Sequence, residues 1–356
     1  EHGTGTVPVF VDINEDGLSD LIVANFYQYK DVLDKESVLS YYRNTGTSNS
    51  PAFTLIDDNY LDLNLQAYGL HSIPTFGDLD NDGDQDLLLG REDGTLVYFQ
   101  NSSTGSGAIY SSAQINYKDN LNQTINAGPY CFPQLFDLNN DGLLDLILGK
   151  KTGELIYYRN IGSQSSPSFE LYNSNLGNID VSTANPDGYP TPHFFRYNGE
   201  TRLFLGDLTG RCNFYLGVDG NIDPTESFTL ISDNYANINT QAYSSFWVND
   251  LNNDGNLELY VGQDLGGIYR LENDPNSTSS LQETMNEIDV VLYPNPTSNL
   301  LTINALENRI AFVQVTNIEG KIVYSEFMGT NKATVDSSIY SAGIYFVKVQ
   351  LQNGDS

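Results

Sequence analysis

Short apolar runs separated by polar turns recur along most of this chain. Many of them contain β-branched or aromatic residues and are bounded by Gly, Asp, Asn or Pro, a pattern that predicts buried strands. Clear examples are residues 9–11, 21–23, 87–89, 146–148 and 259–261. The pattern therefore predicts an all-β fold.

A nine-residue acidic loop precedes the second apolar run of a repeated unit and occurs four times. Each copy has Asp at position 1, Asn or Asp at 3, Asp at 5, Gly at 6 and an acid at 9; the copies span 12–20, 78–86, 137–145 and 250–258. Side chains at alternate positions of a tight loop converge, and converging carboxylates repel one another unless a cation lies between them. Oxygen-only ligands favour a hard ion, so we expect about four Ca²⁺ ions, one in each loop.

The EF-hand shares the opening of this loop but also needs a bidentate Glu at loop position 12 and a helix on each side. Position 12 is apolar in all four copies, as Val23, Leu89, Leu148 and Val261. The loop is therefore expected to join two strands. An Asx-rich turn that binds no metal is the alternative.

Each loop belongs to a longer repeat. A hairpin signal and a third strand follow at 91–101 and 150–160, and a fourth strand follows a Ser/Pro-rich bend at 49–56 and 165–171. A fifth copy at 192–206 keeps two strands but has lost the acids, so we expect a plain hairpin without metal near Asn198. Repeated four-stranded units of this length predict the blades of a β-propeller.

Together, the loop, its flanking strands and the hairpin resemble the FG-GAP or VCBS repeats, which form the calcium-bearing β-propeller of integrin alpha subunits. The resemblance covers residues 7–273. It implies that the side chains at positions 1, 3, 5 and 9 bind calcium, with the residue at position 7 contributing its backbone carbonyl. The implied ligand residues are Asp12, Asn14, Asp16, Leu18 and Asp20; Asp78, Asp80, Asp82, Asp84 and Asp86; Asp137, Asn139, Asp141, Leu143 and Asp145; and Asp250, Asn252, Asp254, Asn256 and Glu258. Glu258 departs from the usual Asp, so a weaker or distorted site is expected there.

The fifth repeat ends after its third strand at 267–272. Residues 1–6 are short and rich in Gly and Thr, so we do not expect the start of the chain to supply the missing outer strand. An open arc of blades leaves strand edges exposed. We therefore expect upstream sequence to add about two blades, giving a ring of about seven.

The polar stretch at 274–288 predicts a linker between the propeller, 1–273, and a separate module, 289–356. Apolar alternation at 290–293, 300–303, 312–316, 320–324 and 343–351 predicts a small Ig-like β-sandwich. The Tyr-Pro-Asn-Pro start at Tyr293, the Gly320–Lys321 hairpin and the strand at 341–349 resemble the C-terminal sorting domain of type IX secretion cargo in Bacteroidota. The short final strand of that family is expected to be missing. An ordinary fibronectin-like accessory domain is the alternative.

The formal net charge is −30, with 46 acidic against 16 basic residues. A surplus of this size repels nucleic acids and anionic membrane surfaces, so no nucleic-acid partner is expected. No apolar run is long enough for a transmembrane segment. The first residues lack the apolar core of a signal peptide, so we interpret the N-terminus as a processed or truncated end of a secreted protein.

Catalytic machinery is not apparent in the sequence. The histidines His2, His71 and His193 belong to no His-Glu-x-x-His motif, and no Gly-x-Ser-x-Gly occurs. His71 and His193 each fall near the start of a blade, where packing or hydrogen bonding between blades is expected. Paired acids could imitate a glycosidase, but the calcium register already explains most of them. The chain is therefore expected not to be an enzyme.

Two further residue types leave alternatives open. Export permits a disulfide between Cys131 and Cys212, although the two occupy different positions of successive blades, which argues against pairing. Trp247 and the many tyrosines could stack on sugars, but their places within repeated strands favour packing in the core.

The sequence thus favours a calcium-binding adhesion module, exported and anchored at the outer cell surface through its C-terminal domain. It would bind an extracellular glycan or protein and contact the type IX secretion machinery. One alternative is an accessory part of a larger secreted hydrolase whose catalytic domain lies upstream. A surface spacer without a specific ligand is another.

Overall fold

The computed structural model describes residues 2–31, 34–62, 68–103, 107–183, 187–272, 290–293, 299–305, 309–317, 321–341 and 345–351. Contacts between Cα atoms divide the chain into two compact units, Glu1–Ser280 and Leu281–Ser356. The stretch interpreted as a linker, 274–288, lies outside the described residues.

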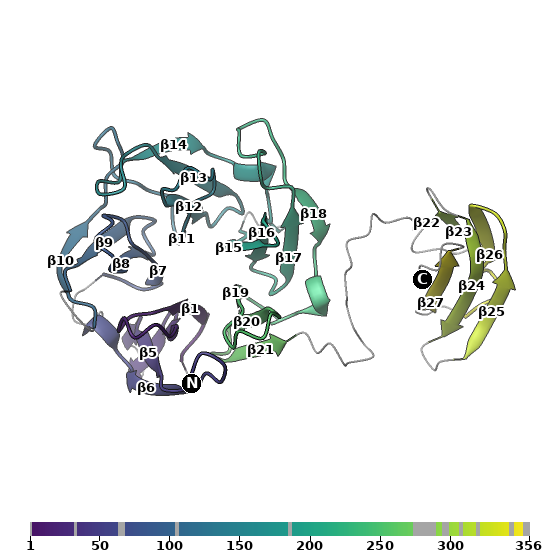
Figure 1. The fold of residues 1–356 in the computed structure, drawn as a ribbon, viewed down its shortest axis with the longest axis horizontal. Helices are drawn as coiled ribbons and strands as arrows, with labels where there is room; N and C mark the ends of the chain where they lie inside the picture. The colour runs from purple at the N-terminus through teal and green to yellow at the C-terminus, as the bar shows by residue number, and fades with distance from the viewer. Residues whose placement is uncertain are drawn as a thin grey trace. The chain divides into compact units, whose positions relative to one another are not determined.

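Among its described residues, the first unit has five antiparallel sheets of three or four strands that follow one another in chain order around an axis (Figure 1). We call them blades 1 to 5. Blade 1 contains β1 (Val7–Val11), β2 (Asp20–Ala24), β5 (Leu39–Asn44) and β6 (Phe53–Asp57). Blade 2 contains β7 (Ile73–Gly77), β8 (Asp86–Gly90), β9 (Leu96–Asn101) and β10 (Tyr110–Ile115). Blade 3 contains β11 (Phe132–Phe136), β12 (Asp145–Gly149), β13 (Leu155–Asn160) and β14 (Phe169–Asn173).

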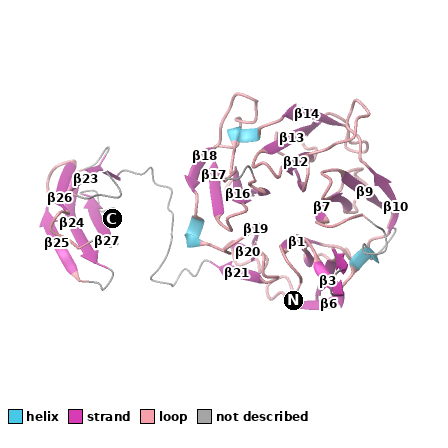
Figure 2. Ribbon diagram, turned by 180° about the vertical axis from the view of Figure 1, so that it is seen from behind, coloured by secondary structure: helices cyan, strands magenta, loops and turns pink. Residues whose placement is uncertain are grey.

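Blade 4 contains β15 (Thr191–Tyr197), β16 (Glu200–Gly206), β17 (Cys212–Leu216) and β18 (Thr229–Ser232). Blade 5 contains only β19 (Ser245–Asn249), β20 (Glu258–Gly262) and β21 (Ile268–Glu272) among the described residues. The helices are single 3-10 turns, η1 (Tyr60–Asp62), η2 (Leu176–Asn178) and η3 (Tyr235–Asn237), each after a fourth strand (Figure 2). The all-β prediction and the four-stranded repeat are confirmed.

The innermost strands β1, β7, β11, β15 and β19 lie next to one another around the axis. The second residue of four of them is proline, namely Pro8, Pro74, Pro133 and Pro192. Proline cannot donate a backbone hydrogen bond, so it is tolerated only where a strand forms the edge of a sheet. The recurring proline therefore marks the strand whose free edge faces the central channel.

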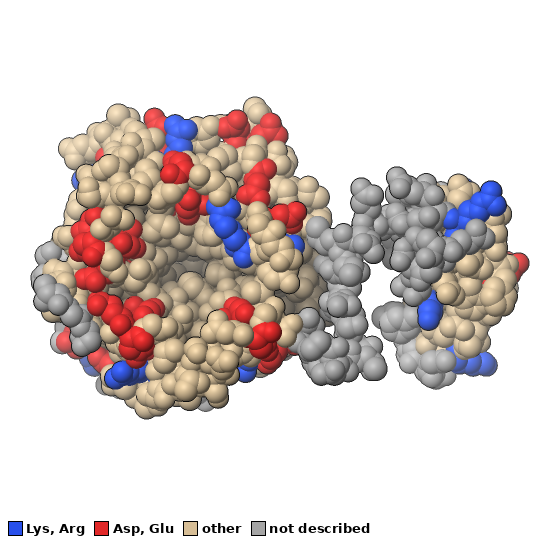
Figure 3. Space-filling view, viewed as in Figure 1, with Lys and Arg blue, Asp and Glu red and all other residues tan. Residues whose placement is uncertain are grey.

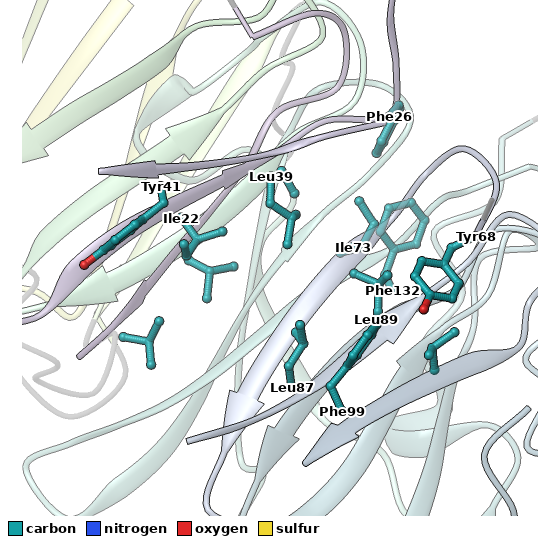
Figure 4. Close-up of a cluster of buried hydrophobic side chains, with 14 of the residues drawn as sticks. Ile22, Phe26, Leu39, Tyr41, Tyr68, Ile73, Leu87, Leu89, Phe99 and Phe132 are labelled. Atoms are coloured by element: carbon teal, nitrogen blue, oxygen red, sulfur yellow. The ribbon is translucent and has the colours of Figure 1, made fainter. Parts of the chain in front are cut away.

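The core fills the spaces between neighbouring blades. Ile22, Leu39, Leu87 and Leu89 are fully buried between blades 1 and 2 (Figure 4). These residues come from the second and third strands, which read as near-continuous apolar runs because both faces of a blade are covered. Burial of such side chains stabilises the fold by roughly 1.5–3 kcal/mol each.

The expectation of a seven-bladed ring is not met in this structure, because β1 lies directly against β19 and β20 of blade 5. The backbone N–H of Thr6 donates to the carbonyl of Gln263 at 3.0 Å, and that of Gly5 donates to Asp264 at 3.2 Å. Ser244 and Tyr243 make the equivalent bonds to blade 4, to Asp207 and Leu208. The sequence predicts that the first residues are too short to complete blade 5. In the structure, residues 2–6 attach blade 1 to blade 5 in the same way as the connections between other neighbouring blades.

Blade 5 has no fourth strand among the described residues, as the sequence predicted, and β21 is the outer strand of its described part. Leu271 is 42% exposed, whereas Phe99, at the equivalent position of β9, is 6% exposed. Blade 1, by contrast, has an extra element. It carries an additional hairpin that the sequence reading did not predict, formed by β3 (Gln28–Asp31) and β4 (Asp34–Glu36).

A circle of five aromatic side chains, one from each blade, lies where the inner strands begin. Neighbouring ring centroids in this circle are 4.5–5.3 Å apart; its members are Phe26, His71, Tyr130, Tyr189 and Tyr243. The last four have left-handed backbones, with φ between 45° and 62°. Gly5 takes the equivalent place before β1, where a Cβ atom would meet the ring of Phe26 at 2.2 Å. Because the acidic loops follow the inner strands, the circle lies at the other end of the channel.

The described residues of the second unit form two three-stranded sheets that share one core. One sheet has β22 (Val290–Tyr293), β23 (Leu300–Ala305) and β26 (Lys332–Asp336); the other has β25 (Ile322–Phe327), β24 (Ile310–Asn317) and β27 (Tyr345–Leu351). Ile303, Ile310 and Val313 are completely buried between the sheets. The two-sheet arrangement agrees with the expected sandwich, and β26 is a strand that the sequence reading missed. The Ig-like label and the missing last strand stay predictions.

Candidate metal centres

The four acidic loops share one backbone conformation. Position 4 is left-handed in every copy, with φ of 59° at Glu15, 58° at Asn81, 63° at Asn140 and 54° at Asn253. The Gly at position 6 is also left-handed, with φ between 85° and 99°. Glycine adopts this region without steric cost, so the two positions together turn the chain back on itself.

Backbone donors hold the loop carboxylates in the same way in each copy. The N–H of the position 6 glycine donates to the position 1 carboxylate at 2.8–3.1 Å; the pairs are Gly17–Asp12, Gly83–Asp78, Gly142–Asp137 and Gly255–Asp250. The N–H at position 7 donates to the position 5 carboxylate at 2.8–3.1 Å; the pairs are Leu18–Asp16, Asp84–Asp82, Leu143–Asp141 and Asn256–Asp254. The carboxylates at positions 1 and 5 are thus each held in place by at least one backbone N–H group.

Some of the predicted ligands come close enough together to hold a cation. Oxygens of Asp78, Asp80 and Asp82 all lie within 4.8 Å of one another, as do those of Asp250, Asp254 and Glu258. In the second loop, Oδ1 of Asp78 and Oδ1 of Asp80 are buried and have no hydrogen-bond partner among the described residues. Buried oxygens without a donor are costly, and a bound cation would remove that cost. The donor set therefore fits a hard divalent ion.

The acid at position 9 differs from the others because it is completely buried. It begins the second strand, as Asp20, Asp86, Asp145 and Glu258, each 0% exposed. In blades 2 and 3 its carboxylate accepts three hydrogen bonds, from the N–H at loop position 2, a tyrosine hydroxyl and an asparagine N–H. These donors are Leu79 (3.1 Å), Tyr98 (3.0 Å) and Asn101 (2.8 Å) for Asp86, and Leu138 (3.1 Å), Tyr157 (2.9 Å) and Asn160 (2.8 Å) for Asp145.

This carboxylate connects the loop to the rest of its blade. The asparagine that donates to it ends the third strand, and its own side-chain oxygen accepts N–H groups from the bend that follows. Asn160 Oδ1, for example, accepts from Gly162 at 3.1 Å and from Ser168 at 3.0 Å. Asn44 and Asn101 make the same pair of contacts. The acidic loop, third strand and outer bend are therefore held by one hydrogen-bond chain.

Burial raises the pKa of Asp86 and of Asp145 to about 6, and the three hydrogen bonds to each carboxylate only partly oppose this. The pKa of Asp20 is raised for the same reason. A divalent cation near these groups would favour the charged form and lower the pKa again.

Blade 5 replaces the tyrosine of this chain with arginine. Arg270 donates to Glu258 Oε1 at 3.3 Å, and the N–H of Leu251 donates to Oε2 at 2.7 Å. The guanidinium offsets the charge of this buried carboxylate. The weaker or distorted site expected at Glu258 stays a prediction.

Blade 4 has lost its loop and carries arginines in place of the acids. β15 and β16 pair from Thr191–Gly206 to Tyr197–Glu200 around Asn198 and Gly199, so the predicted hairpin is confirmed. Strand register places Arg196 and Arg202 where other blades have positions 1 and 9, and Phe214 where they have tyrosine. Arg196 donates to the carbonyl of Asp137 in blade 3 at 2.8 Å.

The remaining candidate residues lie outside these centres. His193 is buried and accepts a hydrogen bond from blade 5, and His71 belongs to the aromatic circle. Both therefore make contacts between blades, as the sequence predicted. Cys131 and Cys212 are both buried and unpaired. Trp247 packs against Phe10 and His193, with ring centroids 6.2 and 4.7 Å away.

Two family models match parts of this chain. Residues 12–89 and 78–148 match the FG-GAP-like repeat, which covers the first three acidic loops, and residues 291–356 match the Secretion system C-terminal sorting domain. The chain carries FG-GAP-like repeats and a type IX sorting domain. Such a domain indicates export and attachment at the outer cell surface of Bacteroidota. Among the described residues, no helix is long and apolar enough to cross a membrane.

Similarity to solved structures is remote. One is PorZ, a bacterial surface component of the type IX secretion system of Porphyromonas gingivalis, at 14% identity and a TM-score of 0.34 over 98% of this chain. This chain spans about 50% of the length of that structure. Another is BBS1N, solved in complex with ARL6DN, at 13% identity and a TM-score of 0.29 over 76% of each chain. No curated protein matches the chain.

Proposed function

We propose that the protein is a calcium-braced binding module displayed on the bacterial surface, where it attaches to an extracellular glycan or protein. The observation that carries the proposal is the shared geometry of the four acidic loops. Each holds the same carboxylates with the same backbone donors, and the second leaves two buried carboxylate oxygens without a donor.

Binding rather than catalysis is favoured by the roles of the repeated acidic residues and the buried histidines. The carboxylates are used at the loops, and the buried histidines are used between blades. The five blades form a rigid scaffold whose connecting loops differ, and loops on a rigid scaffold are the usual place for recognition.

Thermal unfolding in saturating calcium and in chelator tests the metal part of the proposal. A ligand that binds only the folded state stabilises it by about 2.7 kcal/mol at one hundred times its Kd, so calcium should raise the Tm by several degrees. Magnesium at the same concentration is the control, because it demands a smaller octahedral site. An unchanged Tm in calcium would remove the metal assignment.

Export is tested by fusing residues 289–356, with a final family-type strand restored, to a reporter in a type IX-competent bacterium. The reporter should reach the cell surface. Retention in the periplasm would contradict the assignment of the C-terminal unit. A glycan-array and matrix-protein screen, run with and without chelator, then tests ligand binding.

A further inference from the structure

A cavity of about 440 Å³ lies where the acidic loops of blades 1 and 2 meet blade 5. Figure 3 shows a central hollow with acidic side chains grouped around it and a basic side chain at its rim. Trp247 lines both this cavity, which we call the loop-face cavity, and a much narrower channel of about 40 Å³ beneath it. The circle of aromatic rings lies at the far end of that channel, and the loop-face cavity is the wider of the two spaces.

Aromatic rings from three blades form the apolar part of the loop-face cavity. They are Phe10 of blade 1, Phe76 of blade 2 and Trp247 of blade 5. Trp247 packs against Phe10 and His193, with ring centroids 6.2 and 4.7 Å away. An indole fixed in this way loses little conformational freedom on binding, and its face attracts cations and alkyl groups next to a cation.

The polar part of the loop-face cavity is negative. Asp12 and Glu15 line it, and its lining residues in the described part of the chain include no Lys, Arg or His. Asp12 is a predicted calcium ligand, so a bound ion would offset its charge. Glu15, at loop position 4, is outside that ligand set, so its carboxylate is not used as a ligand when calcium is bound.

Glu15 is also an unusual residue for its backbone conformation. The other three loops have Asn at this left-handed position, as Asn81, Asn140 and Asn253. Asparagine tolerates positive φ much better than glutamate does. Glutamate in the one loop whose fourth position lines the cavity thus has a conformational cost that the other loops avoid, and a cost of this kind points to a use for the side chain.

We propose that the loop-face cavity binds an alkylammonium group, with the rings of Trp247 and Phe76 against its carbon atoms and Glu15 facing its charge. The group can belong to a small quaternary amine or to a lysine side chain at the tip of a protein loop. Aromatic faces beside a carboxylate are the chemistry that recognises such cations. The inference rests on the proposed function as a binding module and names the ligand chemistry.

Trp247 provides the measurement, because it is the single tryptophan of the chain. Its fluorescence is followed while choline is added in saturating calcium. The comparison ligand is 3,3-dimethylbutan-1-ol, in which carbon replaces the charged nitrogen. Choline should give a saturable change, and the neutral compound should bind at least about tenfold more weakly. Equal affinities, or no saturable change with choline or with N-acetyl-lysine methylamide, would overturn the proposal. The tighter of these two cations identifies the source of the group.

Glu15→Asn is the decisive variant, because it installs the residue that the other loops already have. It should lower choline affinity about tenfold while leaving the Tm in calcium unchanged or slightly higher. Glu226→Asn, a matched change at an exposed acid outside the cavity, should leave the affinity unaltered. Trp247→Leu, followed by calorimetry, should abolish binding. Undiminished affinity in Glu15→Asn would overturn the proposal.

Failure here is distinguishable from failure of the proposed function. A protein that is stabilised by calcium but ignores both cations keeps its metal-braced scaffold and loses only this ligand assignment. A protein that binds choline but is not stabilised by calcium keeps this ligand assignment and contradicts the metal part of the proposed function.

Discussion

Nε2 of His193 in blade 4 accepts a hydrogen bond from the backbone N–H of Val248 in blade 5, at 2.9 Å. The same contact recurs between other blades. Phe194 N–H donates to Gln134 Oε1 at 2.7 Å, and Leu135 N–H donates to Thr75 Oγ1 at 3.0 Å. In each case the side chain of the third residue in one inner strand accepts a hydrogen bond from the backbone N–H of the fourth residue in the next inner strand. A side chain thus takes the place of the backbone acceptor that a neighbouring strand would provide in a continuous sheet.

This contact predicts acid sensitivity. Burial lowers the pKa of His193 to about 4. The unfolded chain takes up this proton near pH 6.5, whereas the folded protein takes it up only near pH 4. The contribution of His193 is therefore complete above about pH 6.5 and declines as the pH falls. The decline should reach about 2 kcal/mol between pH 7 and pH 5.

His193→Gln tests the prediction, because Gln134 shows that glutamine fits the equivalent place and keeps the acceptor. Denaturant unfolding of both proteins at pH 7 and pH 5, at constant calcium, isolates the histidine, since all other titrating groups are shared. The unfolding free energy of the variant minus that of the parent should be larger at pH 5 than at pH 7. The same difference at both pH values would contradict the assignment.

The metal assignment predicts an ion count that changes with one residue. Asp82→Ala removes the position 5 carboxylate of the second loop, whose oxygens group with those of Asp78 and Asp80. We expect the variant to bind one calcium fewer than the parent by elemental analysis and calorimetry. Glu200→Ala, a matched change in the blade 4 hairpin, should leave the count unchanged. Equal counts in Asp82→Ala and the parent would argue against the second loop as a site.

The repeated loops and their strands could be predicted because each signal is local. The Asp–Gly loop, the apolar run after it and the Ser/Pro bend all lie within one repeat, and each repeat confirms the others. The pairing of the position 9 acid with Tyr98 or Tyr157 had a usable signal as well. Tyrosine or phenylalanine recurs two residues after the start of each third strand, except in blade 5, where Arg270 faces Glu258.

The blade count could not be predicted, because it depends on contacts between distant residues. Thr6 and Gln263 meet across nearly the whole repeat region, and nothing near residue 6 indicates that partner. The aromatic circle is different, since a pattern existed. His71, Tyr130 and Tyr189 each stand three residues before the inner-strand proline, and Gly5 stands three before Pro8. The hairpin of β3 and β4 was missed because it is short and polar throughout.

The buried cysteines should be unreactive in the folded protein. Burial raises the pKa of the Cys131 thiol and of the Cys212 thiol well above the ordinary value, and the thiolate is the reactive form. A thiol reagent such as a nitrobenzoate disulfide should therefore label both residues only after unfolding. Reductant should leave the Tm unchanged, because no bond joins them. Rapid labelling in native buffer, or a Tm that falls in reductant, would contradict the buried unpaired state.

Tyr157→Phe should destabilise blade 3 without leaving a cavity. The hydroxyl donates to the buried carboxylate of Asp145 at 2.9 Å, and a hydrogen bond to a charged group contributes about 1.5–3 kcal/mol. Phenylalanine fits the site, since Phe214 occupies it in blade 4, where Arg202 replaces the acid. Tyr158→Phe is the matched control, because its hydroxyl donates to no loop carboxylate in the structure. Unfolding by denaturant should show a loss of about 2 kcal/mol for Tyr157→Phe and a much smaller change for the control. Equal losses in the two variants would mean that the hydrogen bond to Asp145 does not hold the loop against the third strand.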